Sequence, residues 1–211
     1  NRLISKDGLT YRFPIRQGVT FHDGTHMTPE DVRYSLMRFM LVDRAGGPSA
    51  LLLEPILGIG STRDGSGTIK VDFKDVEKAV RIEGDDVVIT LPKPFAPFLS
   101  VMARWSYVMS RKWAMAHGEW DGGSATWRQY NNPEKERSYF FEHMNGTGPF
   151  KLERWDRTAK YVLLTRNERY WRKPAALKRV LVKAVPEFST RRLMLQAGDA
   201  DIIETPRPLL S

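Results

Sequence analysis

Residues 10–40, TYRFPIRQGVTFHDGTHMTPEDVRYSLMRFM, place a strand, two turns and a helix side by side, and so constrain the local fold more than any other segment. Tyr11, Phe13 and Ile15 alternate with other residues in the two-residue period of a half-buried strand. Pro14 has no N–H to donate, so it predicts an edge strand or a strand end. Two glycine-containing turns follow before the helix begins.

The second half of this segment predicts a helix with a defined start. Thr28 suits the N-cap and Pro29 the first helical position, while Asp31 predicts a weak form of the capping box. Apolar residues then recur with the helical period, at Val32, Leu36, Phe39 and Met40. We therefore expect an amphipathic helix that packs this face on a core.

The composition excludes several classes of protein. The 211 residues include no cysteine, which excludes thiolate catalysis, thiolate metal sites and disulfides. No apolar run reaches the roughly 18 residues that a membrane-spanning helix needs. The net charge is +8, but the 33 Lys and Arg are interspersed with 25 Asp and Glu. This favours a solvated mixed-charge surface over a stripe that binds nucleic acid.

The middle of the chain mixes β-rich and helical patterns. Residues 80–91 predict a hairpin around a Gly-Asp-Asp turn. Residues 98–103 and 111–117 predict short helices, and residues 105–110 favour a strand between them. Residues 118–145 are polar but carry six aromatic side chains. That content is too high for disorder, so we expect a partly ordered excursion that packs on the core.

A second β-rich region follows residue 145. Its predicted strands lie at residues 150–155, 161–166 and 177–185. Ser189 or Thr190 is expected to cap a last helix, and Gly198 is expected to end it. A short strand is expected at residues 199–203.

Three blocks, in the right order, carry a resemblance to a known family. They are residues 10–40, the pair of motifs at 146–150 and 166–171 (Gly-Thr-Gly-Pro-Phe and Arg-Asn-x-x-Tyr-Trp), and residues 191–202 with Leu195, Gly198, Asp201 and Ile202. Together they resemble the family 5 extracellular solute-binding proteins, which are peptide and nickel receptors of ABC importers. The resemblance covers residues 10–111 and 145–205, and residues 112–144 depart from it.

The resemblance implies an α/β (mixed α+β) fold of the type II periplasmic-binding-protein class, present only in part. Residues 1–145 would form a small subdomain of lobe one, and residues 146–211 part of the main lobe-one sheet and helix. The second lobe is expected to be absent, because members of the family are much longer than 211 residues. Residues 206–211 hold no recognisable closing element, which also suggests a piece of a longer protein.

The resemblance further implies capture of a peptide or other small solute in the periplasm or extracellular space. The receptor would be a monomer that delivers its ligand to ABC permease subunits in the membrane. No enzymatic activity, cofactor, metal or nucleic-acid partner is expected. The alternatives are a nickel or oligosaccharide receptor of the same fold, a solute-binding module of a regulatory or nucleic-acid-binding protein, and a hydrolase. No Gly-x-Ser-x-Gly elbow supports the hydrolase.

The same resemblance implies ligand contacts in two segments. One is the loop and helix start after the first helix, here Ser49 and Leu51. The other contains Arg104, Trp105 and Tyr107. Arg104 would pair with a carboxylate, and the two aromatic rings would stack on an extended ligand. The alternative is that the rings belong to the core and Arg104 is a surface charge.

Two further motifs favour a structural interpretation. His22, Asp23 and His26 are metal-ligand types, but they fall on a turn and not on one helical face. Residues 145–148, Asn-Gly-Thr-Gly, resemble a phosphate-binding loop but lack its Lys and its following helix. We therefore expect a turn and a connector at these positions.

Overall fold

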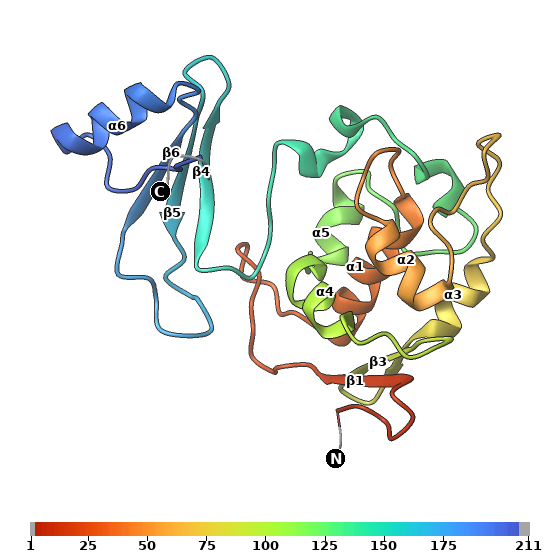
Figure 1. The fold of residues 1–211 in the computed structure, drawn as a ribbon. Coiled ribbons are helices and arrows are strands. Elements are labelled where there is room, and N and C mark those ends of the chain that lie inside the picture. The colour runs from red at the N-terminus through yellow and green to blue at the C-terminus, as the bar shows by residue number, and fades with distance from the viewer. Residues whose placement is uncertain (1–2, 207–211) are drawn as a thin grey trace. The chain divides into compact units, whose positions relative to one another are not determined.

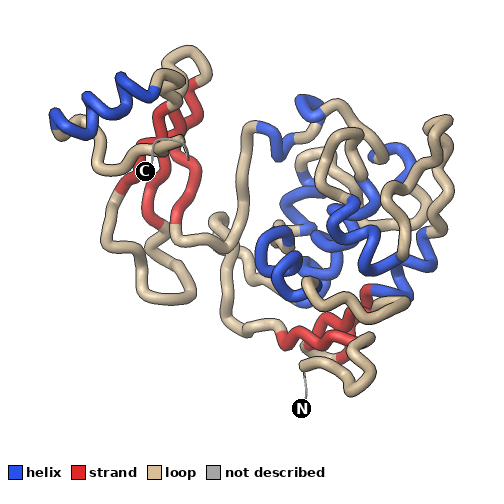
Figure 2. Tube along the Cα trace, viewed as in Figure 1, coloured by secondary structure: helices blue, strands red, loops and turns tan. Residues whose placement is uncertain are grey.

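The computed structural model describes residues 3–206, so the expectation for the last residues, 207–211, lies outside the described part. The chain divides into two compact units, drawn in Figures 1 and 2. Unit 1 comprises residues 1–151 and 166–176, and unit 2 comprises residues 152–165 and 177–211. Each unit is described by itself below.

Unit 1 contains an antiparallel sheet with the strand order β1-β3-β2. Its strands are β1 (Thr10–Pro14), β2 (Val80–Glu83) and β3 (Asp86–Thr90). β1 is an edge strand that ends at Pro14, as the proline predicted. β2 and β3 form the predicted hairpin, with Ile82 opposite Val87. The alternation in β1 buries Tyr11, whose ring lies 4.6 Å from that of Phe98.

Helices cover this sheet. They are α1 (Pro29–Val42), α2 (Ala50–Leu57), α3 (Phe73–Ala79), α4 (Phe98–Trp105) and α5 (Arg111–Ala116), with 3₁₀ turns at Trp127–Tyr130, Lys135–Arg137 and Tyr139–Phe141. α1 is the central element, since it contacts α2, α5, β2 and β3 (Figure 1). The core around it includes Met40, Leu52, Leu53, Val76 and Ile89, all fully buried. Each such side chain contributes about 1.5–3 kcal/mol through removal from water.

The start of α1 confirms the predicted capping box. The Asp31 carboxylate accepts the backbone N–H and the hydroxyl of Thr28, each at 2.9 Å. This satisfies polar groups that the first helical turn leaves without an intrahelical partner. The buried face differs from the predicted stripe. Leu36 and Met40 are buried as predicted, but Val32 and Phe39 are only half-buried. Tyr34, Met37 and Leu41 are buried in addition, because α1 is enclosed by other elements on several sides.

One prediction of secondary structure in unit 1 was wrong, and two helical features were not predicted. Residues 106–110 form no strand, and Trp105 instead ends α4. α2 continues through Pro55, where the missing N–H costs one hydrogen bond in an otherwise well-buried helix. α3 was not predicted, although Asp72 caps it by accepting the Lys74 N–H at 3.0 Å. In each case burial against neighbouring elements outweighs the local pattern.

The excursion that follows α5 packs on the core, as predicted. Trp120 and Trp127 are buried, and the Tyr34 hydroxyl donates to the Trp120 carbonyl at 2.6 Å. Buried Glu119 pairs with Arg38 of α1 and accepts from the Tyr139 N–H at 2.7 Å. These contacts attach the irregular segment to the central helix.

Unit 2 is a three-stranded sheet with one helix. The sheet has the order β4-β5-β6, from β4 (Phe150–Asp156), β5 (Tyr161–Arg166) and β6 (Arg179–Lys183). The helix α6 (Phe188–Ala197) begins after Glu187, so Ser189 and Thr190 lie inside it and not at its cap. Gly198 ends it in the left-handed conformation, as predicted, with φ of 81°. The expected strand at 199–203 is absent from the described residues. No helix within residues 3–206 has both the length and the apolar character needed to cross a membrane.

Candidate functional site

The structure brings three of the predicted ligand-contacting residues together at the end of α4. The Arg104 guanidinium lies 4.9 Å from the centre of the Trp105 ring and donates a hydrogen bond to the Tyr107 hydroxyl. The rings of Trp105 and Tyr107 meet edge to face, with centroids 6.5 Å apart. Tyr107 is 58% exposed, so it is not the core aromatic of the alternative interpretation.

The local chain path explains this cluster. α4 ends at Trp105, and the Ser106 N–H and hydroxyl both donate to the Met102 carbonyl, at 3.1 and 2.6 Å. The chain then leaves the helix, which lets Tyr107 reach back to Arg104 in the last helical turn. The half-buried Trp105 ring anchors the cluster, since it packs 6.3 Å from the ring of Phe39 on α1.

The other two predicted residues differ from each other. Ser49 is buried, and its hydroxyl donates to the Phe39 carbonyl at 2.7 Å. Phe39 therefore contacts both predicted segments, through Ser49 and through Trp105. Leu51, in the first turn of α2, is among the exposed apolar side chains. A ligand contact by either residue stays a prediction.

The exposed cluster has defined chemical abilities. An arginine side chain presents several N–H groups in one plane, and such a fork matches a carboxylate. Because the Tyr107 hydroxyl accepts from Arg104, its own proton remains free to donate. The ring of Tyr107 offers an exposed apolar face. The arrangement can thus bind an anionic group next to an apolar or planar one.

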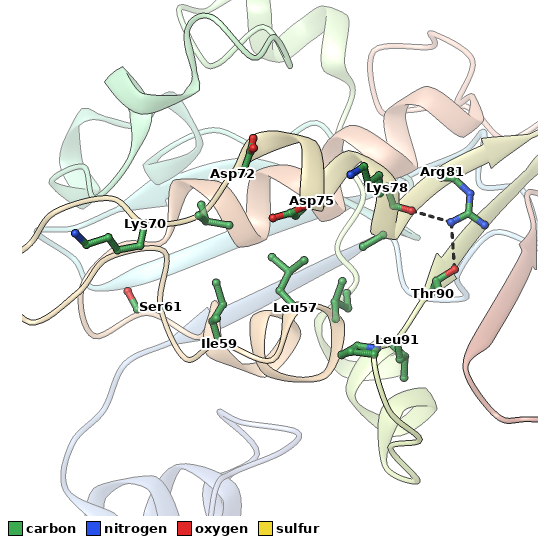
Figure 3. A pocket seen from close by; sticks show the side chains of 14 residues that line it. Leu57, Ile59, Ser61, Lys70, Asp72, Asp75, Lys78, Arg81, Thr90 and Leu91 are labelled. Carbon is green, nitrogen blue, oxygen red and sulfur yellow. Dashed lines mark hydrogen bonds between the residues drawn. The ribbon is translucent and has the colours of Figure 1, made fainter.

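Unit 1 also contains a pocket that the sequence did not reveal. The pocket has a volume of about 480 Å³ and lies between α2, α3 and the end of β3 (Figure 3). Its lining is largely apolar, from Ile56, Leu57, Ile59, Val71, Ala79, Leu91 and Pro92. Figure 3 shows Leu57 and Ile59 pointing into the space below α3. None of the five predicted ligand-contacting residues lines it.

Charged residues at the edge of this pocket are engaged in holding the fold. The Arg81 guanidinium donates to the Lys78 carbonyl at 2.7 Å and to the Thr90 hydroxyl at 3.1 Å (Figure 3). Lys70 pairs with Asp64 at 3.1 Å. The sequence does carry a signal for the helix that forms one wall of this pocket. Asp72 is followed three residues later by Asp75, a spacing typical of a helix N-terminus with an acidic first turn.

The candidate metal residues form a turn. The Asp23 carboxylate accepts the N–H and the hydroxyl of Thr25, at 2.8 and 2.7 Å. It also accepts from the Asn145 amide at 2.8 Å, while His26 is exposed. Within residues 3–206, no group of three or more His, Asp or Glu side chains is placed to hold a metal ion.

Comparisons with known proteins agree with this fold. The model of the bacterial extracellular solute-binding proteins, family 5 (middle part), matches residues 3–210. The glutathione-binding protein GsiB of Salmonella typhi is 28% identical over 198 residues, which are 93% of this chain and 31% of that protein. The chain thus spans less than a third of the length of this curated relative.

Solved structures show the same class of fold. The periplasmic binding protein DppA from Helicobacter pylori, in complex with the peptide STSA, gives a TM-score of 0.58 at 25% identity, over 93% of this chain and 35% of that one. NikZ from Campylobacter jejuni, in complex with Ni(L-His), gives a TM-score of 0.58 at 25% identity, over 93% of this chain and 32% of that one. The oligopeptide-binding protein AppA from Bacillus subtilis, in complex with a nonapeptide, gives a TM-score of 0.63 at 22% identity, over 93% of this chain and 32% of that one. This likeness supports the fold alone.

These neighbours place the chain in the type II periplasmic-binding-protein class, present in part, which confirms the expected fold. The chain belongs to the bacterial extracellular solute-binding proteins, family 5.

Proposed function

We propose that this chain is part of an extracytoplasmic receptor that captures a peptide-like solute for an ABC importer. The family match over residues 3–210 supports a binding role. The peptide complex of the DppA neighbour, and the glutathione named for GsiB, support a ligand with peptide character. The receptor acts by binding alone, without catalysis.

The single observation that carries the ligand class is the exposed cluster of Arg104, Trp105 and Tyr107. A peptide or short amino-acid derivative presents a carboxylate near apolar or planar groups. The Arg104 guanidinium and the free Tyr107 proton suit the carboxylate, and the ring of Tyr107 suits the neighbouring group. Exposed Leu51 would contact the ligand from the other predicted segment, and buried Ser49 would support Phe39, on which Trp105 packs.

The mechanism would be closure of two lobes around the ligand. In this proposal residues 1–145 are the small subdomain of lobe one, and residues 146–211 are part of its main sheet and helix. A second lobe, outside this chain, supplies the opposing contacts, so a bound ligand bridges the lobes and stabilises the closed state. The closed receptor is a monomer in the periplasm or extracellular space, and it docks on the permease subunits.

A chelate of a metal with an amino acid is the runner-up ligand. The NikZ neighbour holds Ni(L-His), and such a ligand also presents a carboxylate to a guanidinium. Arg104 would serve both ligands, so the two proposals differ in what co-purifies with the receptor and not in this contact.

The test uses the full-length protein that contains this chain. Mass spectrometry identifies what co-purifies, and calorimetry then measures its affinity for the wild type and for Arg104→Ala. Losing a charge-assisted hydrogen bond costs about 1.5–3 kcal/mol, so affinity should fall roughly ten- to hundredfold.

Arg128→Ala is the matched control. Arg128 also lies over a tryptophan, with its guanidinium 5.3 Å from the centre of the Trp127 ring, but it belongs to the excursion. Its removal should leave the affinity unchanged. Equal affinity of the wild type and Arg104→Ala would refute the role of Arg104, and failure to bind any peptide or chelate would refute the receptor.

A further inference from the structure

His22 connects two distant segments of unit 1 through its backbone and its ring. One is the signature turn, residues 21–25, and the other is the exit segment, residues 145–151, which includes the first two residues of β4. The His22 N–H donates to the Gly146 carbonyl and the Lys151 ammonium donates to the His22 carbonyl, both at 2.9 Å. The two segments lie side by side in Figure 1.

The ring contacts define one protonation state. The Gly146 N–H donates to Nδ1 of His22 at 3.3 Å, so Nδ1 must carry a lone pair. The proton of the neutral ring then lies on Nε2, which donates to the Gly148 carbonyl at 3.2 Å. Both ring nitrogens therefore have partners only when His22 is neutral with its proton on Nε2.

Protonation would remove one of these contacts. A proton on Nδ1 faces the Gly146 N–H, so two donors oppose each other where one hydrogen bond stood. The Gly146 N–H then has no acceptor on the ring, while the bond from Nε2 to Gly148 persists. The ring would have to turn away, or the exit segment would have to move.

The surroundings of His22 also favour the neutral ring. Burial comes first, and with the positive charge of Lys151 it holds the pKa of His22 below its usual value, although the Gly148 carbonyl and Asp23 act in the opposite direction. Arg169 adds a second cation near the turn. Its guanidinium comes so close to Gly24 that a Cβ there would lie 2.6 Å from Nη1.

We propose that His22 is an acid-sensitive contact, whose protonation breaks the hydrogen bond from the Gly146 N–H of the exit segment to the ring in the signature turn. The loss is local, because other bonds to the exit segment do not depend on the ring. The Asp23 N–H donates to the Asn145 side-chain oxygen at 3.2 Å, and the Asn167 amide donates to the Gly148 carbonyl at 3.0 Å. Acid thus removes the ring as acceptor for the Gly146 N–H, while the bond from the His22 N–H to the Gly146 carbonyl and the two neighbouring contacts remain.

Nuclear magnetic resonance on the full chain tests this proposal with two readouts. One is the titration of the His22 ring. The other is the exchange protection of the Gly146 amide, corrected for the intrinsic effect of pH, from about pH 7.5 to about pH 4.5. Below the pKa of His22, protection at Gly146 should fall by up to about tenfold for each pH unit, because the neutral ring becomes that much rarer.

Two variants separate His22 from other acid effects. His22→Asn keeps a side-chain acceptor but does not titrate, so protection at Gly146 should no longer depend on pH. His26→Asn removes the exposed histidine just after the same turn and should behave as the wild type.

Three results would each overturn the proposal. Protection at Gly146 could stay constant while the His22 ring titrates in the folded protein. The ring could stay neutral throughout the pH range in which the protein is folded. His22→Asn could keep the pH dependence of the wild type. The first two are measured on the wild type, so they decide the question even if His22→Asn does not fold.

Discussion

Unit 1 and unit 2 differ in how far their apolar side chains are buried. All of the buried apolar residues of the described chain belong to unit 1, with Leu52 fully buried beside α1. In the described part of unit 2 no side chain is buried, and apolar side chains lie open on both β6 and α6. Leu181 of β6 is 59% exposed and Leu193 of α6 is 64% exposed.

The difference indicates that unit 1 holds its own core, whereas the described part of unit 2 does not. A sheet or helix is stable when its apolar face is covered, and exposed apolar groups in number mark a surface that other parts of a protein cover. The chain spans 31% of the length of GsiB, which leaves ample polypeptide for that purpose in a whole family member.

Truncating the core of unit 1 should have the largest effect. Leu52→Ala leaves a cavity in the packing around α1, and such changes cost about 2–5 kcal/mol of unfolding free energy. Urea unfolding followed by tryptophan fluorescence measures it, since buried Trp120 and Trp127 both lie in unit 1. A loss below about 1 kcal/mol would contradict a self-sufficient core.

Breaking the Arg38–Glu119 pair should have the second largest effect on the free energy of unfolding. Their side chains are 13% and 7% exposed, so Glu119→Gln leaves a buried cation without its counter-charge, which costs about 3 kcal/mol. Urea unfolding measures the loss. Glu83→Gln, at an exposed pair with Arg12, is the control and should change stability little. Equal effects of the two variants would show that burial is not what makes the first pair matter.

The same pair predicts an acid dependence. Burial opposes ionisation of Glu119, but Arg38 and the hydrogen bonds from Ser138 and Tyr139 outweigh it and hold the pKa of Glu119 below its usual value. The stability gained is therefore complete above the ordinary Glu pKa and is lost as the pH falls through the lower pKa of the folded state. The stability difference between the wild type and Glu119→Gln should narrow on acidification. A constant difference down to about pH 3 would refute this link.

Removing the cap of α1 should have a smaller effect. Besides its contacts to Thr28, the Asp31 carboxylate accepts the Arg111 N–H at 2.8 Å. Asp31→Ala should cost about 1–2 kcal/mol, the usual range for a lost helix cap. Glu30→Ala, in the same helical turn but at an exposed position, is the matched control. If both variants unfold at the same urea concentration, the capping box contributes nothing beyond the local charge.

The smallest effect is expected in unit 2. Leu181→Ala removes the same atoms as Leu52→Ala but from an exposed position on β6, so stability should change by less than about 0.5 kcal/mol. The two leucine variants thus form a matched pair across the units. A loss for Leu181→Ala that equals the loss for Leu52→Ala would show that unit 2 has a core of its own.

Local signals in the sequence predicted much of the fold. Thr28 with Asp31 marked the start of α1, Pro14 marked an edge strand, and Gly198 marked the end of α6. Each depends on the backbone geometry of one residue or on a hydrogen bond across one turn, so neighbouring residues suffice to predict it. The errors, such as the expected strand at 105–110, arose where apolar residues without clear periodicity are placed by distant partners.

The candidate site, too, could be predicted from the sequence only in part. Its residue types, a cation beside two aromatic rings at 104–107, could be read from the sequence, as could the family resemblance. Their exposure could not, because it depends on Phe39 of α1 supporting Trp105 while Tyr107 stays in solvent. The 480 Å³ pocket was likewise hidden, because its walls come from three segments that meet only in the folded chain.

The sequence by itself determined the family, the helix and strand boundaries with strong local signals, and the absence of cysteine chemistry. Tertiary structure alone decided that Glu119 lies buried against Arg38, that His22 meets Gly146, and that unit 2 leaves its apolar side chains open. The physical reason is the distance along the chain over which each effect acts. Backbone geometry and capping act within a few residues, whereas burial, charge pairing and the protonation of a ring depend on segments more than 80 or 120 positions apart in the chain.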